Sequence, residues 1–279
     1  MKINKIIKLT LKTFDSIYRD LAIKFGGSVY STLFNVRARL RRKDITFTFI
    51  KKELVYIAQS RFLKRCFTEK YQNWNTYGNG LEKRARALGE SYFLDLIQFK
   101  QNDIVIDCGA NIGDLELYFI VNNISVRYLG IEPSPEEYAC LCRNVGPQNS
   151  LNFGLWSEDK ELEFYVSSAN ADSSLITPRK YDKKIIVSAR RLDSLLTERV
   201  KLLKLEAEGA EPEVLIGSGN KLSLVEYISA DLGFERGLQE ESTLCPVINY
   251  LLSRDFELVT IGYPRHVALF KRKFPALSN

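Results

Sequence analysis

Short apolar runs alternate with helical patterns of apolar residues over most of this chain. The strand-like runs are residues 104–106, 128–131, 150–156, 200–205 and 225–230. Such short apolar runs are typical of strands that are buried on both faces of a parallel sheet. The segments between them place apolar residues three or four positions apart, which indicates amphipathic helices. This order predicts an α/β fold with a doubly wound, mostly parallel sheet.

Two alternating segments follow the last helical pattern, at residues 256–261 and 266–270, with Gly and Pro between them at 262–264. Alternation on both sides of such a turn predicts an antiparallel hairpin, which we expect at the edge of the sheet. Residues 161–166 and 185–189 also alternate, and they predict more exposed strands.

The first 80 residues follow a different pattern. Apolar residues recur at helical spacing over residues 3–25, with lysines between them, and a second helical piece follows. Residues 45–50 then alternate, and residues 54–57 follow across a lysine-rich turn, which predicts a short β-hairpin. We therefore expect an N-terminal appendage of helical arm and hairpin over residues 1–80, and the core domain over residues 81–279.

The positive charge of the chain is concentrated in this arm. The net charge is +6, but residues 1–44 hold eleven Lys or Arg against three Asp, a local charge of +8 that leaves −2 elsewhere. The basic face is either solvated, or packed on the core or on a second subunit of a homo-oligomer, or it lies on an anionic membrane surface. Nucleic acid is not expected as a partner, because aromatic residues are not interleaved with the basic ones as stacking platforms.

The sequence shows no membrane span, no signal peptide and no metal-binding pattern. No run reaches the roughly 18 apolar residues of a span, and lysines interrupt any signal-peptide core. The five cysteines form no disulfide framework, and His266 is the single histidine, so a histidine-based metal site is not expected. We therefore expect a cytoplasmic protein without a bound metal, whose arm could touch the inner face of a membrane.

A turn that contains two glycines follows the first core strand. Asp107 closes that strand, and Gly109 and Gly113 then flank three residues before a helical pattern begins at Leu115. A strand, a glycine turn and a helix N-terminus bring backbone N–H groups to the edge of a bound nucleotide. Nineteen residues beyond Gly113, Glu132 ends the next strand, where a carboxylate can accept both hydroxyls of a ribose.

Two nucleotide cofactors compete for this turn. A dinucleotide site has the pattern G-x-G-x-x-G, whereas this chain has three residues between Gly109 and Gly113. Asp107 would repel a pyrophosphate, but it suits a ligand with an ammonium group, such as S-adenosylmethionine. The pattern therefore favours S-adenosylmethionine. An NAD(P)-dependent oxidoreductase and a purely structural turn without a ligand are the alternatives.

A pair of carboxylates ends another core strand. Glu206 and Glu208 flank Ala207 directly before Gly209, and the strand ends of an open α/β sheet face one crevice. Two acids this close tend to raise one pKa, which brings a carboxylate nearer the range useful for proton abstraction. We expect Glu206 to be the base and Glu208 to hold the turn or the acceptor. The alternative is a helix N-terminus with acids that complement its dipole.

Four motifs together resemble the FkbM family of methyltransferases. They are D-C-G-A-N-I-G at 107–113, G-I-E-P at 130–133, G-L-W-S at 154–157 and K-L-E-A-E-G-A-E at 204–211. The last motif departs from the usual K-[IL]-D-V-E-G-x-E, with Glu206 in place of Asp and Ala207 in place of Val. The resemblance covers about residues 85–270.

The resemblance implies a Rossmann-like class I methyltransferase sheet. It also implies transfer of a methyl group from S-adenosylmethionine to a hydroxyl of a sugar, a glycan or another small-molecule acceptor. The residues that we expect to bind the cofactor are Asp107, Gly109, Asn111, Gly113, Glu132, Pro133, Leu155 and Trp156. We expect Gly109→Val to abolish cofactor binding while the protein stays folded. A non-catalytic scaffold that binds a partner through its basic arm is the non-enzymatic alternative.

Overall fold

The computed structural model describes residues 19–22, 24–68, 76–167 and 173–273 of the chain. The chain divides into two compact units, Met1–Arg84 and Ala85–Asn279. Most of the helical arm predicted over residues 3–25 lies outside the described residues. Among the described residues, no helix combines the length and the apolar character needed to cross a bilayer.

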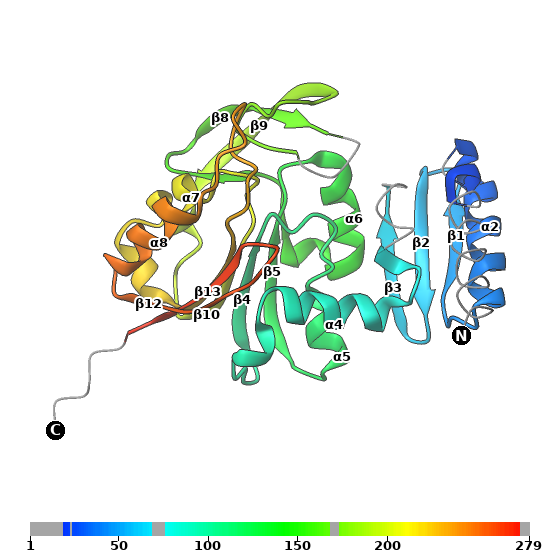
Figure 1. Cartoon of the computed structure of the whole chain (residues 1–279), viewed down its shortest axis with the longest axis horizontal. Coiled ribbons are helices and arrows are strands. Elements are labelled where there is room, and N and C mark those ends of the chain that lie inside the picture. The colour runs from blue at the N-terminus through cyan, green and yellow to red at the C-terminus, as the bar shows by residue number, and fades with distance from the viewer. Residues whose placement is uncertain (1–18, 23, 69–75, 168–172, 274–279) are drawn as a thin grey trace, which may run out of the picture. The chain divides into compact units, whose positions relative to one another are not determined.

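The first unit packs a helix against a three-stranded antiparallel sheet (Figure 1). Its elements are α2 (Gly27–Leu40), β1 (Thr46–Ile50), β2 (Val55–Ser60) and β3 (Leu63–Phe67). The ring of Phe34 on α2 lies 3.8 Å from that of Phe47 on β1, centroid to centroid, so aromatic packing joins the two layers. The predicted hairpin is β1 and β2. The neighbouring strand β3 was not predicted, because the buried Arg65 interrupts the alternation of apolar and polar residues in that strand.

The second unit is built on a seven-stranded sheet, with a separate three-stranded sheet (Figure 1). Its α-helices are α4 (Leu81–Ser91, which begins in the first unit), α5 (Glu116–Val121), α6 (Pro135–Val145), α7 (Glu211–Gly217) and α8 (Leu244–Leu252). The strands of the large sheet are β4 (Asp103–Cys108), β5 (Val126–Ile131), β6 (Ser150–Leu151), β10 (Val200–Leu205), β11 (Val225–Asp231), β12 (Phe256–Ile261) and β13 (Val267–Arg272). The small sheet contains β7 (Gly154–Trp156), β8 (Lys160–Val166) and β9 (Lys183–Arg191).

The strand order of the large sheet is β12-β13-β11-β10-β4-β5-β6. The strands from β11 to β6 run parallel, and β13 is antiparallel to both of its neighbours. This topology confirms the predicted doubly wound sheet with an antiparallel hairpin at its edge. The carboxyl ends of β4, β5, β10 and β11 consequently meet at one edge of the sheet.

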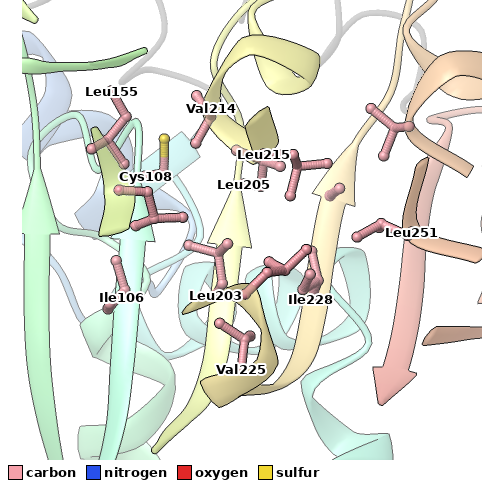
Figure 2. Close-up of a cluster of buried hydrophobic side chains, with 14 of the residues drawn as sticks. Ile106, Cys108, Leu155, Leu203, Leu205, Val214, Leu215, Val225, Ile228 and Leu251 are labelled. Carbon is pink, nitrogen blue, oxygen red and sulfur yellow. The ribbon is translucent and has the colours of Figure 1, made fainter. Parts of the chain in front are cut away.

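The two faces of the large sheet bury two separate hydrophobic clusters. Ile106, Leu203 and Ile228 point to the face covered by α7 and α8 (Figure 2). Their neighbours Val105, Leu202 and Tyr227 join the cluster that contains residues of α4, α5 and α6. Because successive side chains of a strand point to opposite faces, the continuous apolar runs in the sequence are explained by burial on both faces.

The strand predicted over residues 150–156 is wrong as one element. The chain forms β6, which pairs with β5, and then β7, which pairs with β9 in the small sheet. Between them, the side-chain amide of Asn152 donates to the carbonyls of Glu132 and Pro133 (2.9 and 3.1 Å). The Asn152 side chain thus bonds to the backbone at the point where the pairing of β6 with β5 would continue, and the chain passes into the small sheet.

Candidate active site

The turn after β4 is built from residues with left-handed backbone conformations. Gly109, Asn111 and Gly113 have φ angles of 68°, 51° and 83°. The Gly109 N–H donates to the carbonyl of Ile131 at the end of β5 (3.1 Å). A Cβ atom on Gly109 would lie 1.9 Å from the carbonyl oxygen of Glu206. The turn therefore lies directly against the end of β10, and it admits no side chain at this position.

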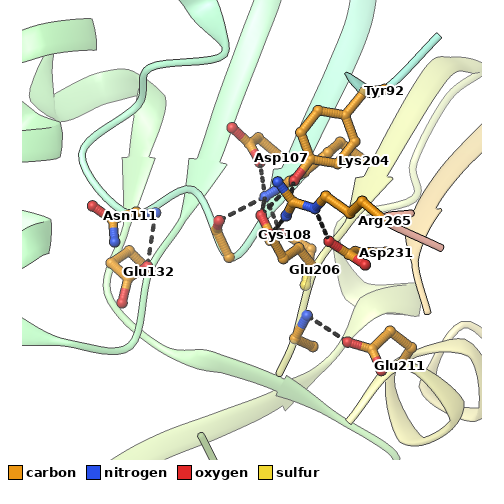
Figure 3. A network of polar contacts seen from close by, with 12 residues as sticks. Tyr92, Asp107, Cys108, Asn111, Glu132, Lys204, Glu206, Glu211, Asp231 and Arg265 are labelled. Carbon is orange, nitrogen blue, oxygen red and sulfur yellow. Dashed lines mark hydrogen bonds and ion pairs between the residues drawn. The ribbon is translucent and has the colours of Figure 1, made fainter. Parts of the chain in front are cut away.

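Glu132 lies at the end of β5, beside this turn (Figure 3). Its carboxylate accepts the N–H groups of Asn111 (2.8 Å) and Ser134 (2.9 Å). Burial raises the pKa of Glu132 to about 7, although the two backbone donors act to lower it. Pro133 follows directly and is half-buried. The carboxyl group of Glu132 is thus fixed against the glycine turn.

A group of polar side chains lies at the carboxyl ends of β4, β10 and β11 (Figure 3). The strand-end cluster, as we call it, consists of Tyr92, Asp107, Lys204, Glu206, Asp231 and Arg265. Among its members, only Asp107 and Glu206 were expected as site residues from the sequence.

The ammonium group of Lys204 joins two carboxylates of this cluster. Its Nζ lies 3.0 Å from Oδ1 of Asp107 and 3.0 Å from Oε2 of Glu206, and it donates to the carbonyls of Cys108 and Gly109 (3.1 and 2.7 Å). Only 4% of the side chain is exposed. Burial acts to lower the pKa of Lys204, but Asp107 and Glu206 raise it well above its ordinary value, so the ammonium stays charged.

Asp107 is enclosed by its own chain. The residue is 1% exposed, and the Tyr128 hydroxyl donates to its Oδ2 (2.5 Å). Burial raises the pKa of Asp107, while Lys204 and the Tyr128 hydrogen bond act to lower it. The structure gives this carboxylate the ammonium group of Lys204 as a partner, where the sequence suggests the ammonium of a ligand.

Glu206 has three partners. The Tyr92 hydroxyl donates to its Oε2 (2.6 Å), the Arg265 guanidinium pairs with its Oε1, and Lys204 completes the set. Burial opposes the charge of Glu206, but Lys204 and Arg265 outweigh burial and lower the pKa to about 2. The expected upward shift is therefore wrong for Glu206, because two cations surround its carboxylate.

The chain has left the strand conformation at Glu208. This residue has a φ of 48°, and its carbonyl accepts the hydroxyl of Ser174 (2.7 Å). The turn is held by Glu211, whose carboxylate accepts the N–H groups two and four residues before it (3.2 and 2.8 Å). Burial raises the pKa of Glu211 to about 7. Glu206 and Glu208 therefore do not share one face of a strand. Glu211 bonds to the turn, and the expected role of Glu208 in holding the turn or the acceptor stays a prediction.

Arg265 reaches the cluster from the turn between β12 and β13. Its guanidinium pairs with Asp231 at the end of β11 and with Glu206, and it donates to the Tyr92 hydroxyl (3.2 Å). The cluster thus combines three carboxyl groups with two cations. Of the cluster residues that were not expected from the sequence, Lys204 could have been recognised. It is a charged residue within an apolar strand, and it lies two positions before Glu206, so both side chains point to the same face.

Leu155 and Trp156 lie on β7, in the small sheet. The Leu155 side chain is buried in the hydrophobic cluster of Figure 2. The ring of Trp156 lies 5.8 Å from the ammonium of Lys160, and its carbonyl oxygen lies 2.1 Å from where a Cβ atom on Gly217 would be. The structure places neither side chain in the strand-end cluster, and their contact with a cofactor stays a prediction.

No group of three or more His, Cys, Asp or Glu side chains suited to a metal ion occurs within the described ranges. Cys108 lies next to the cluster, and burial raises the pKa of its thiol. The polar groups of the strand-end cluster are three carboxyl groups, two cations and the Tyr92 hydroxyl.

Comparison with known proteins identifies the family of this chain. Residues 107–258, more than half of the chain, match the family model described as the methyltransferase FkbM domain. The chain is 22% identical to the 2-O-methyltransferase NoeI of Sinorhizobium fredii over 219 residues, which cover 70% of this chain and 89% of that protein. It is 25% identical to the hexuronic acid methyltransferase AglP of Haloferax volcanii over 143 residues, 49% of this chain and 59% of that protein. A putative tRNA methyltransferase of Streptococcus pneumoniae, solved with S-adenosylmethionine, superposes with a TM-score of 0.41 at 11% identity, over 70% of this chain and 75% of that one. The chain therefore belongs to the FkbM methyltransferase family.

Proposed function

We propose that this protein is an S-adenosylmethionine-dependent O-methyltransferase that acts on a hydroxyl of a sugar or glycan. Its family supports the reaction class. The observation that carries the cofactor assignment is Glu132, a buried carboxyl group held against the glycine turn at the end of β5. In an open α/β sheet, this position meets the ribose of a bound nucleotide.

The residues at the strand ends fit this cofactor better than a dinucleotide. Asp107, Glu132, Glu206 and Asp231 place carboxyl groups at or next to the ends of four neighbouring strands, and they outnumber the two cations of the strand-end cluster. Carboxyl groups in excess of cations disfavour a pyrophosphate and favour a ligand with a sulfonium and an ammonium group. When bound, S-adenosylmethionine supplies a methyl group on a cationic sulfur.

Two relatives support a sugar as the acceptor. Their names describe a 2-O-methyltransferase and a hexuronic acid methyltransferase. Methyl transfer to oxygen needs the acceptor oxygen in line with the breaking bond, and this positioning supplies much of the acceleration. It also needs a group that takes the hydroxyl proton as the new bond forms.

Replacing Glu132 with glutamine is expected to weaken cofactor binding. A glutamine offers one acceptor oxygen where the carboxylate offers two, so one ribose hydroxyl is left without its partner, at a cost of about 1–3 kcal/mol. This corresponds to a dissociation constant roughly 5- to 150-fold higher. Isothermal titration with S-adenosylhomocysteine measures the change, and Glu136→Gln, at an exposed position of the same segment, serves as the matched control.

The same titrations decide between the cofactors. If Glu132→Gln binds S-adenosylhomocysteine with an affinity within twofold of the wild type, Glu132 does not accept the ribose hydroxyls. Tight binding of NAD or NADP by the wild type, with no binding of S-adenosylhomocysteine, would overturn the proposed function in favour of an oxidoreductase.

We also propose that the first unit contacts an anionic membrane surface. Phe25, just before α2, and Val29, Val36 and Leu40 on α2 are between 43% and 71% exposed. The spacing of Val29, Val36 and Leu40 places them on one face of the helix. The exposed basic residues that follow are Arg39, Arg41, Arg42 and Lys43. An apolar stripe next to basic residues is typical of a helix that lies in a membrane interface.

Sedimentation with lipid vesicles tests this contact. The wild type is expected to pellet with vesicles that contain phosphatidylglycerol, and to stay in solution with pure phosphatidylcholine. Phe25→Glu/Leu40→Glu is expected to stay in solution with both, whereas Leu54→Glu, at another exposed position of the same unit, should behave as the wild type. Equal pelleting of the wild type with both kinds of vesicle would contradict an electrostatic contact.

A further inference from the structure

We propose that the acceptor hydroxyl binds beside Glu235 and transfers its proton to that carboxylate. This inference rests on the proposed function and assigns the acceptor side of the same site. Glu235 lies on the loop between β11 and α8, and no sequence motif singles it out. The argument depends on where the loop is held, on what surrounds the carboxyl group, and on the exposed rings next to it.

The loop is fixed directly over the turn that follows β10. The guanidinium of Arg236 forms two hydrogen bonds with the carboxylate of Glu213 (2.7 and 2.8 Å), and it donates to the carbonyl of Gly209 (2.5 Å). The Cα of Arg236 lies 2.6 Å from where a Cβ atom on Gly209 would be. Because its neighbour is held this closely, Glu235 has a defined position beside the strand-end cluster.

The carboxyl groups of Glu235 and Asp231 both lie near Gly233, and that of Glu235 has no hydrogen-bond partner among the described residues. Its Oε1 and the Oδ1 of Asp231 lie 3.3 and 3.5 Å from the Cβ position of Gly233. In the part of the chain that the structure describes, no hydrogen-bond donor or cation contacts the carboxyl of Glu235. The residue is half-buried, so the lone pairs that a base needs are available to a ligand.

The surrounding charges suit a proton acceptor. The pKa of Glu235 is raised to about 8. Burial is the largest cause, and the negative charges of Asp231 on β11, Glu206 after β10 and Glu211 on α7 act in the same direction. Arg265 from the β12–β13 turn acts in the opposite direction. A base is most effective when its pKa lies near the working pH.

The other candidates in the cluster are less suited to this role. Glu206 is held by two cations and a hydroxyl, which keep its pKa at about 2. Asp231 is paired with Arg265. Burial and Glu206 hold the pKa of Tyr92 well above its ordinary value, so the hydroxyl stays protonated and acts as a donor. The carboxylates of the strand-end cluster are therefore paired with its cations, and Glu235 beside the cluster is the group available to accept a proton.

Phe234, the neighbour of Glu235 in the chain, belongs to a group of exposed aromatic rings. Phe234 is 61% exposed and Tyr263 is 90% exposed. The ring of His266 lies 5.4 Å from that of Phe234 and 6.4 Å from that of Tyr263. A patch of exposed rings marks a binding surface, and the apolar C–H face of a pyranose ring can pack on it while a ring hydroxyl turns toward Glu235.

In the reaction, the acceptor oxygen forms a bond to the methyl carbon as the methyl–sulfur bond breaks. The electron pair of the breaking bond goes to sulfur, so the sulfonium becomes the neutral thioether of S-adenosylhomocysteine. The hydroxyl proton passes to the carboxylate of Glu235, which later releases it to solvent. No further reactant is needed.

The test measures kcat against pH with two probes, methyl glucopyranoside and methyl glucuronoside, and S-adenosylmethionine labelled in its methyl group. The wild-type kcat is expected to rise with pH through a pKa near 8, because the carboxylate must be deprotonated to accept the proton. Glu235→Gln should lower kcat by about 10²–10⁴ and remove this rise. Glu235→Asp should recover part of the rate.

Two controls separate the possible failures. Glu240→Gln, an exposed carboxylate of the same loop, should keep the wild-type profile, and all variants should bind S-adenosylhomocysteine as the wild type does. A Glu235→Gln enzyme with the wild-type profile would overturn this inference alone, as would loss of the pH dependence in His266→Gln instead. A wild type that binds S-adenosylhomocysteine and methylates neither glycoside would overturn the sugar-directed function, and this inference with it.

A second measurement needs no acceptor. Folding raises the pKa of Glu235, so its protonated form is favoured in the folded state, and this contribution to stability is lost as the pH rises through about 8. Glutamine stays neutral and suffers no such loss. The Tm of Glu235→Gln relative to the wild type should therefore increase between pH 5 and pH 9. A difference that is constant over this range would place the pKa at its ordinary value and overturn the inference.

Discussion

Gly109→Ala is expected to lower the free energy of unfolding by roughly 3–5 kcal/mol. The φ of 68° at Gly109 is unfavourable for alanine. Its Cβ would also lie 1.9 Å from the carbonyl oxygen of Glu206, and that residue is itself held, because its N–H donates to the carbonyl of Cys108 (3.2 Å). The ends of β4 and β10 must separate to accommodate the methyl group. Urea denaturation measures the loss.

The same geometry corrects the expectation that Gly109→Val stays folded. Valine adds two methyl groups to a position that does not accept one, so loss of cofactor binding in that variant would accompany loss of the fold. Gly237→Ala is the matched control, since φ is 69° there and the nearest atom to an added Cβ is a methyl carbon of Ile176 at 3.7 Å. If the free energy of unfolding fell equally in Gly109→Ala and Gly237→Ala, the result would contradict the close contact between Gly109 and the Glu206 carbonyl.

Lys204→Met is expected to destabilise the protein by about 3–5 kcal/mol at pH 7. The substitution keeps much of the side-chain volume, but it removes the ammonium that lies 3.0 Å from both Asp107 and Glu206. The carboxylates of Asp107 and Glu206 then lose a common cation. The carbonyls of Cys108 and Gly109 lose the ammonium as a donor, although the carbonyl of Cys108 keeps the N–H of Glu206. Thermal and urea unfolding of the purified variant measure the effect.

A second substitution shows whether charge is the cause. Adding Glu206→Gln to Lys204→Met removes one of the two carboxylates, and it should recover part of the lost stability. Lys201→Met on the same strand should cost less, because its partner Glu226 keeps Arg199 (3.0 Å). If Lys201→Met loses as much stability as Lys204→Met, or if the double variant recovers none, the stability loss in Lys204→Met comes from packing and not from charge.

Much of the fold can be predicted from the sequence because its signals are local. The strands β4, β10 and β11 are mostly apolar because both faces of these strands are largely buried. The distance from Gly113 to Glu132 covers one helix and one strand, so it places that carboxyl at the end of β5 without knowledge of any contact. The terminal hairpin was recognisable from alternation and its Gly-Tyr-Pro turn.

The electrostatics of the site depend on contacts that leave no local pattern. Tyr92 and Arg265 meet Glu206 from positions 114 and 59 residues away in the chain. Without knowledge of these two contacts, the closeness of Glu206 and Glu208 in the sequence suggests that one of them has a raised pKa. With them, the pKa of Glu206 falls to about 2. Glu235 was missed for a related reason, because its loop is placed by the pairing of Arg236 with Glu213 and not by any repeat in the sequence.

The position of β13 in the sheet makes the site depend on a segment that is synthesised after β4, β5, β10 and β11. β13 lies between β11 and β12, and Arg265 stands two residues before it. Domains begin to fold from the N-terminus during synthesis, so a nascent chain that stops short of Arg265 leaves β11 as an open edge and Glu206 without its guanidinium partner. A premature stop codon ahead of Arg265 would therefore yield a chain with its glycine turn and its carboxylates, but without a completed strand-end cluster.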